Sequence, residues 1–187
     1  MNIQRNDAAK SVLVAYASGF GTTVGVAEAV AETARRAGWL VHLANMGEEL
    51  QPETFDLVIL GAPIRYDRWF VEARNFVRHH YAALSQTRTT AFFTCLTLSR
   101  SNQASHDQAE LYARKITALL PGTDAQRIGK FAGVLDFAKF PLVQRPIVWL
   151  LMAALRVREG DYRNWAAIEA WTRVQLEINL TSSESKP

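Results

Sequence analysis

Short apolar runs alternate with longer segments of helical periodicity along most of this chain. The run at 57–62 has no polar break, which is typical of a parallel strand covered on both faces. Between the runs, apolar residues recur every three or four positions, as in Val26, Ala27, Val30 and Ala31. The pattern predicts strands at 11–17, 40–44, 57–62, 90–96 and 131–137, and helices at 22–37, 69–84, 109–120 and 165–176. This alternation predicts an α/β fold in which helices cover both faces of a five-stranded parallel sheet, a three-layer sandwich.

The domain organisation follows from the same pattern. The 187 residues suit one domain, which we place at 11–180. An extra apolar helical insertion interrupts the alternation at about 138–158. The polar tail at 181–187 is expected to be disordered.

Composition narrows the function classes. The single cysteine, Cys95, cannot form an internal disulfide, which favours a reducing compartment, and no apolar signal segment begins the chain. A net charge of +3 is too small to indicate nucleic-acid binding. The longest apolar stretch, 146–155, covers about half of the ~20 residues that a membrane span requires. We therefore expect a cytoplasmic protein that binds no nucleic acid.

Candidate chemistry is concentrated in the loop after the first predicted strand, which then leads into a helix. Two glycines allow the backbone amides to converge on an anion, three hydroxyls can donate further hydrogen bonds, and the helix N-terminus adds positive potential. The loop has no lysine, which suits a phosphate monoester better than a nucleoside triphosphate. The predicted phosphate-binding residues are Ser18, Gly19, Phe20, Gly21, Thr22 and Thr23.

Other motifs fit less well. A P-loop would end in Gly-Lys-Ser/Thr, and the dinucleotide fingerprint would need a different spacing from that of Gly19, Gly21 and Gly25. A phospho-receiver domain would have aspartate after the third strand, where Gly61-Ala62-Pro63 stands. The remaining alternative is an ordinary glycine-rich turn without a ligand. No His/Cys/Asp/Glu group has metal-ligand spacing, and no nucleophile–base pair is evident, so no catalytic residue is assigned.

Several segments together resemble the flavodoxin superfamily, and more closely the flavodoxin-type, menaquinone-dependent protoporphyrinogen oxidases of haem synthesis. The matching segments are 13–23, 58–66, 91–96 and 131–135, together with the apolar, basic insertion that follows. The resemblance covers most of residues 11–178. The chain departs from the family pattern at Pro63, where serine is typical, and at Asp67, where glycine is typical.

The resemblance implies FMN as cofactor, with its phosphate at 18–23 and its isoalloxazine ring between loops 63–67 and 94–99. The residues implied around the ring are Pro63, Ile64, Arg65, Tyr66, Thr94, Cys95, Leu96, Thr97 and Leu98. Tyr66 and Trp69 are candidates for covering one face of the ring, or are partly exposed aromatics. Arg65 is a candidate neighbour of the flavin N1 region, or an ion-pair partner. Cys95 is expected to act as a small apolar residue.

The segment 139–158 combines Leu, Val, Trp and Met with basic residues at both ends. It suits contact with an anionic membrane surface, a cover over an apolar substrate or a subunit contact in a homo-oligomer, and a core helix is the alternative. The resemblance implies oxidation of a protoporphyrinogen-like substrate with a membrane quinone as acceptor, which would place the protein peripherally on the inner face of the cell membrane. An electron-transfer flavodoxin and a flavin-free docking module are the alternative functions.

Overall fold

The computed structural model describes residues 9–19, 21–100, 102–120, 122–136, 146 and 158–183, with side chains of the last helix described up to Glu177. Its main sheet has the order β2-β1-β3-β5-β6, and these five strands are parallel. They are β1 (Ser11–Tyr16), β2 (Leu40–Asn45), β3 (Leu57–Arg65), β5 (Thr89–Cys95) and β6 (Gly129–Ala132). The predicted five-stranded parallel sheet is confirmed.

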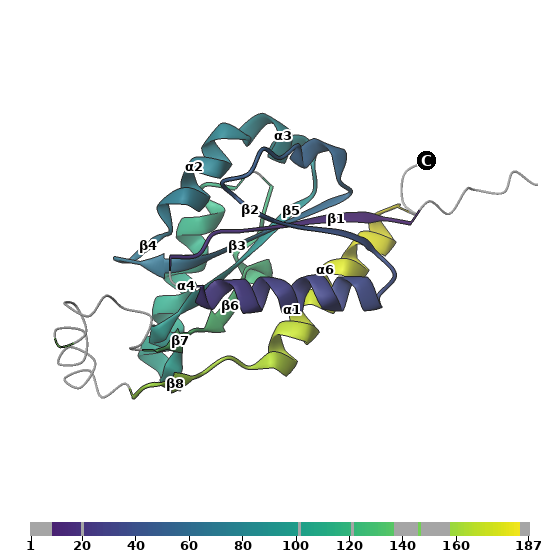
Figure 1. Cartoon of the computed structure of the whole chain (residues 1–187). Coiled ribbons are helices and arrows are strands. Elements are labelled where there is room, and N and C mark those ends of the chain that lie inside the picture. The colour runs from purple at the N-terminus through teal and green to yellow at the C-terminus, as the bar shows by residue number, and fades with distance from the viewer. Residues whose placement is uncertain are drawn as a thin grey trace, which may run out of the picture.

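Helices cover both faces of the sheet (Figure 1). One face packs against α1 (Thr22–Arg36) and α6 (Trp165–Ser183), and the other against α2 (Val71–His79), α3 (Tyr81–Gln86) and α4 (Gln103–Thr117). Alternate residues of each central strand serve the two cores, because successive side chains of a strand point to opposite faces. Val12 and Val14 belong to the α1/α6 core, whereas Leu13 and Ala15 belong to the other.

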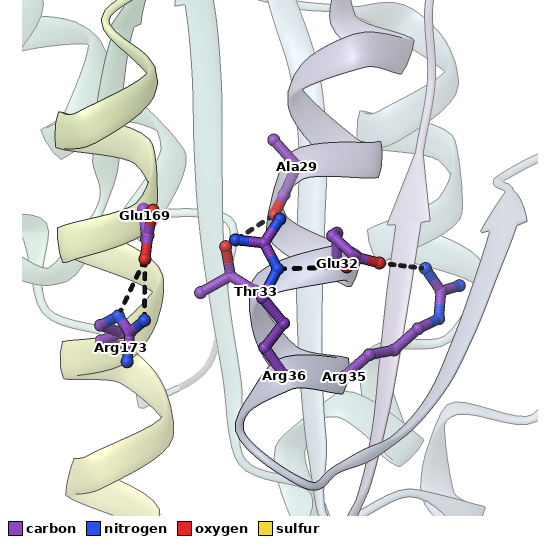
Figure 2. A network of polar contacts seen from close by, with 7 residues as sticks. All are labelled: Ala29, Glu32, Thr33, Arg35, Arg36, Glu169 and Arg173. Carbon is purple, nitrogen blue, oxygen red and sulfur yellow. Dashed lines mark hydrogen bonds and ion pairs between the residues drawn. The ribbon is translucent and has the colours of Figure 1, made fainter.

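Helices α1 and α6 lie side by side on their face of the sheet. The ion pairs drawn in Figure 2 run within each helix: Glu32 contacts Arg35 and Arg36 in α1, and Glu169 contacts Arg173 in α6. These pairs are exposed, and solvent screens pairs of this kind, so they contribute little to stability. The two helices are held instead by apolar side chains, such as Val30 and the fully buried Ile168.

Two short strand pairs extend the carboxyl end of the sheet. β4 (Arg68–Trp69) folds back antiparallel on the end of β3. β7 (Val134–Leu135) pairs antiparallel with β8 (Gly160–Asp161), which precedes α6. The remaining elements are the 3-10 turns η1 (Pro52–Thr54), η2 (Leu96–Ser99) and η3 (Ala125–Arg127).

The structure corrects several boundaries predicted from the sequence: the helix predicted at 109–120, for example, is α4, which begins at Gln103 and ends at Thr117. The helix predicted at 69–84 begins at Val71 and is divided into α2 and α3 at His80, because Trp69 belongs to β4. The strand predicted at 131–137 is divided into β6 and β7 at Gly133, whose amide donates to the carbonyl of Cys95. Helix α6 extends to Ser183, beyond the end predicted at 176.

The insertion predicted at 138–158 lies outside the described residues, apart from Pro146 and Arg158. The β7–β8 pairing does, however, place the residues before and after this segment next to each other.

Candidate functional site

A pocket of about 270 Å³ lies at the carboxyl ends of the parallel strands. Ligands of open α/β sheets bind at this edge. Three of the predicted loops meet there: Gly19 and Thr22 come from the first, Pro63–Tyr66 from the second, and Thr94–Leu96 from the third. The structure therefore brings together the segments that the sequence analysis assigned to one site.

The loop after β1 leaves polar groups without partners. The Oγ atom of Ser18 is buried and has no hydrogen-bond partner among the described residues. Gly21 precedes α1 with a φ of +75°, and no side chain caps the first turn of that helix. The first amides of an uncapped helix are free to bind an anion. Phe20, also predicted here, lies outside the described residues.

Arg65 lies directly against this loop. A Cβ atom added to Gly19 would come within 2.7 Å of Nη1 of Arg65 and 3.3 Å of the Phe70 ring. The guanidinium carbon of Arg65 stands 5.4 Å from the centre of that ring. Arg65 thus places positive charge beside the predicted phosphate loop. Only glycine at position 19 leaves room for its guanidinium there.

Thr23 and Thr94 connect the phosphate loop to the end of β5; Thr94 lines the pocket, whereas Thr23 is not among the residues that line it. Their hydroxyl oxygens lie 3.1 Å apart, and both side chains are buried. This contact joins the first turn of α1 to the end of β5. It holds the first and third predicted loops at a fixed separation.

Cys95 lines the pocket from the end of β5, and its side chain is almost fully buried. Burial raises the pKa of its thiol, although Leu98 and Thr97, which also interact with the sulfur, lower it in part. A buried thiol of raised pKa suits the small apolar role predicted for it. Thr97 and Leu98 lie in η2, behind Cys95, and do not line the pocket.

The second loop is a tight hairpin between β3 and β4. Its central residues, Tyr66 and Asp67, have φ angles of +49° and +57°, a conformation that asparagine or glycine adopts more easily. The hydroxyl of Tyr112 donates to the Asp67 carboxylate, and Lys115 donates to the Asp67 carbonyl. These contacts from α4 hold the hairpin in its strained form.

The two aromatic residues proposed as covers for a flat ligand lie in different places. Tyr66 lines the pocket and is 96% exposed, so its ring is free to lie against a ligand. The expectation for Trp69 is wrong: its side chain is 3% exposed and belongs to the core under α2. The antiparallel pairing of Trp69 with Ile64 turns the indole inward.

Sequence reasoning missed three residues of the pocket wall: Gly133, Val134 and Asp136. They follow β6 and so lie at the same edge of the sheet as the other loops. The predicted strand at 131–137 concealed them, although Gly133 was a signal that the strand would break there.

Within the part of the chain that the structure describes, no three His, Cys, Asp or Glu residues are grouped as a metal site would require. In the same part, no helix is both long enough and apolar enough to cross a bilayer.

Comparisons with known proteins agree with this geometry. The family model described as a flavodoxin domain matches residues 13–160. Protoporphyrinogen IX dehydrogenase (quinone) of Escherichia coli strain K12 is 26% identical over 164 residues, which cover 87% of this chain and 89% of that enzyme.

Solved structures share the fold at low sequence identity. A short-chain flavodoxin associated with a bacterial microcompartment aligns with a TM-score of 0.54 and 10% identity, over 91% of this chain and 99% of its own. Rubredoxin oxygen:oxidoreductase of Desulfovibrio gigas aligns with a TM-score of 0.53 and 13% identity; the match covers 91% of this chain but 37% of that larger protein.

Proposed function

The chain belongs to the flavodoxin-domain family, whose cofactor is FMN, and we propose that it is an oxidoreductase that oxidises a protoporphyrinogen-like substrate and uses a membrane quinone as electron acceptor. The name of the Escherichia coli relative supports this substrate and acceptor. The site described above supports FMN, and the orphaned hydroxyl of Ser18 is the observation that carries the proposal.

The phosphate of FMN fits the loop at 18–23. A buried hydroxyl without a partner costs about 1–3 kcal/mol, and a phosphate oxygen would satisfy the one on Ser18. The uncapped first turn of α1 supplies further N–H donors, and Arg65 supplies a positive charge next to Gly19. A terminal phosphate monoester needs donors of this kind, and the loop provides them without a lysine.

The isoalloxazine ring fits the pocket between the second and third loops. The 270 Å³ volume is close to the lower end of the range of about 300–1,000 Å³ that is usual for ligand pockets. Tyr66 would cover one face of the ring, while Pro63, Ile64 and the backbone around Cys95 and Leu96 would form the walls. Thr97 and Leu98 would act indirectly, by fixing the end of β5.

The chemical roles divide between cofactor and protein. FMN supplies the ability to accept hydride equivalents and to release electrons. The chain binds and orients the ring, excludes water from its edges and sets the charge around it. No side chain is required as a nucleophile, and we assign no catalytic residue.

Peripheral membrane contact through residues 139–158 is part of the proposal, since a quinone acceptor resides in the bilayer. In support, the β7–β8 pair brings together residues 134–135 and 160–161, which flank this segment in the chain, and Val134 is a wall residue of the pocket. A cytoplasmic protein docked on the inner membrane face through this segment would bring the flavin close to the quinone. Vesicle co-sedimentation of a variant with 139–158 replaced by a Gly/Ser linker tests this, and unchanged binding would contradict it.

Substitution Ser18→Ala tests the cofactor assignment. We expect FMN affinity to fall about tenfold, which corresponds to about 1.4 kcal/mol, while the stability of the FMN-free protein stays constant or rises, because an unsatisfied hydroxyl is removed. Ser85→Ala is the matched control: the Ser85 hydroxyl donates to the Tyr81 carbonyl in α3. Equal FMN affinity of the S18A variant and the wild type would contradict the assignment.

The reaction itself is tested with FMN-loaded protein, protoporphyrinogen and a menaquinone. We expect porphyrin to form only when the quinone is present. An FMN-loaded protein that exchanges electrons with redox partners but leaves protoporphyrinogen unchanged would be an electron-transfer flavodoxin instead.

A further inference from the structure

A second hollow, of about 490 Å³, is lined by the β3–β4 hairpin and the start of α2. It shares Arg65 and Tyr66 with the pocket at the carboxyl ends of the parallel strands. Three of the residues that line the second hollow are arginines, Arg65, Arg68 and Arg74, and none is acidic. We call this feature the arginine hollow.

The hairpin register places two of the arginines directly opposite each other. Arg65 and Arg68 are a cross-strand pair, so their side chains leave the ribbon on the same side. Like charges in this arrangement are destabilising. An anion bound beside Arg68 would offset this repulsion.

Arg74 is held at the same place from the helix that follows. Its Nε donates to the backbone carbonyl of Trp69 at 3.0 Å, which fixes the direction of the guanidinium and leaves its outer nitrogens available. Among the described residues, neither Arg68 nor Arg74 forms an ion pair.

The acidic residues close by in the sequence do not neutralise this charge. The carboxylate of Asp67 accepts the hydroxyl of Tyr112 and does not line the hollow. Glu72, in the first turn of α2, lines a different hollow beside the end of β2. The charges of Arg68 and Arg74 are thus left for a ligand.

The walls of the hollow are aromatic and apolar as well as basic. Phe70, the exposed Val71 and the exposed Tyr66 line it together with the buried Trp69. The indole Nε1 of Trp69 is buried without a partner among the described residues. Val71 also begins α2, and no side chain caps its first turn. Such a surface suits a ligand with a flat apolar body and carboxylates at one edge.

We propose that the arginine hollow binds the carboxylates of the substrate, so that a dicarboxylic tetrapyrrole lies across Tyr66 with its ring towards the flavin and its acidic edge towards Arg68 and Arg74. This inference rests on the proposed function. It goes further by naming the residues that hold the carboxylates and by fixing which edge of the substrate points away from the flavin. Bidentate carboxylate recognition is what arginine provides better than lysine.

The test compares protoporphyrin IX with its dimethyl ester, measured by porphyrin fluorescence in the presence of FMN-loaded protein. We expect the wild-type protein to bind the diacid at least about tenfold more tightly than the diester. The variant R68Q/R74Q should lose this preference and keep its FMN affinity. R35Q/R36Q is the control, because it removes the same charge from α1, where both arginines contact Glu32.

The single variant R68Q keeps the hydrogen bond from Arg74 to Trp69. It therefore still tests the proposal if loss of that bond disturbs the fold of R68Q/R74Q. Arg68 is exposed, and we expect its loss alone to reduce the diacid preference severalfold. Equal binding of diacid and diester by the wild type would overturn the proposal, as would equal effects of R68Q/R74Q and R35Q/R36Q.

Anionic lipid headgroups also carry negative charges that arginine side chains bind. If R68Q/R74Q weakened binding to phosphatidylglycerol vesicles and left the diacid preference intact, the arginines would serve the membrane and the proposal would be wrong. Failure of the proposed function gives a different result: FMN would not bind, or the loaded protein would not oxidise protoporphyrinogen, while the diacid preference and its dependence on Arg68 and Arg74 remained.

Discussion

The hydroxyl oxygens of Thr23 and Thr94 lie 3.1 Å apart in the buried interior, at the point where α1 begins and β5 ends. Thr94 lines the pocket and Thr23 does not, although the sequence assigned both to the cofactor. Their contact determines how far the loop at 18–23 stands from the loop that follows Cys95.

Double-mutant analysis measures this link. Thr23→Val and Thr94→Val each leave the other hydroxyl buried without its partner, so each should lower the free energy of unfolding by about 1–3 kcal/mol. The double variant should cost less than the sum, with a coupling of about 0.5 kcal/mol or more in urea denaturation.

The control cycle pairs Thr94→Val with Thr33→Val. The Thr33 hydroxyl donates to the Ala29 carbonyl in α1 (Figure 2), whereas the Thr94 hydroxyl contacts that of Thr23. These two changes should be additive. Additivity of T23V and T94V as well would show that the two hydroxyls are not coupled.

Gly21 and Gly38 form a matched pair for testing the phosphate loop. Both have positive φ, +75° and +83°, and a Cβ atom would meet nothing within 4 Å at either position. Alanine should therefore cost about 1–2 kcal/mol of stability at both, from backbone strain alone. Only Gly21→Ala should weaken FMN binding, because Gly21 precedes α1 whereas Gly38 follows it. Equal FMN affinities in a titration of the two variants would contradict the role of the loop.

The reactivity of Cys95 should reflect its burial. Because burial raises its thiol pKa, less thiolate is present in the folded than in the unfolded chain at about pH 8, near the ordinary thiol pKa. Alkylation by iodoacetamide should be slower than in urea, and slower again with FMN bound, since Cys95 lines the pocket.

The raised pKa of the Cys95 thiol also makes the stability of the protein depend on pH. The folded state favours the neutral thiol, so the contribution of Cys95 is present below the pKa of the unfolded thiol and is lost as the pH rises above it. Cys95→Ala should remove this part of the pH dependence. Alkylation as fast in the folded chain as in urea would contradict the buried environment.

The contact between Tyr112 and Asp67 predicts a second titration. Burial, and then the hydrogen bond to the Asp67 carboxylate, raise the pKa of the Tyr112 phenol. Asp67→Asn tolerates positive φ and still accepts a hydrogen bond, so it should lower this pKa towards its ordinary value without returning it fully. Ultraviolet difference spectra against Tyr112→Phe isolate this phenol. An unchanged pKa in D67N would show that the carboxylate has no influence.

The sheet was predictable from the sequence because parallel strands are buried on both faces and leave unbroken apolar runs, as at 57–62. The phosphate loop was predictable because its glycines and hydroxyls stand between a strand and a helix. The meeting of three loops in one pocket followed from the rule that parallel strands end at the same edge.

Side-chain direction was not predictable in the same way. Trp69 looked like a surface aromatic of a helix, but the tight turn at Tyr66 and Asp67 folds β4 back on β3 and turns the indole into the core. The arginine hollow depends on the same turn, because only the hairpin register brings Arg65 opposite Arg68. The positive φ angles of Tyr66 and Asp67 determine this register, and the pattern of apolar residues does not predict them.

Titration of the cofactor-free protein with FMN, followed by flavin fluorescence and visible absorption, tests the central claim most directly. We expect saturable binding of a single FMN per chain, with flavin absorption bands altered from those of free FMN. Binding should be weaker in S18A than in S85A. A protein that binds no FMN even at high excess would contradict the assignment of the pocket.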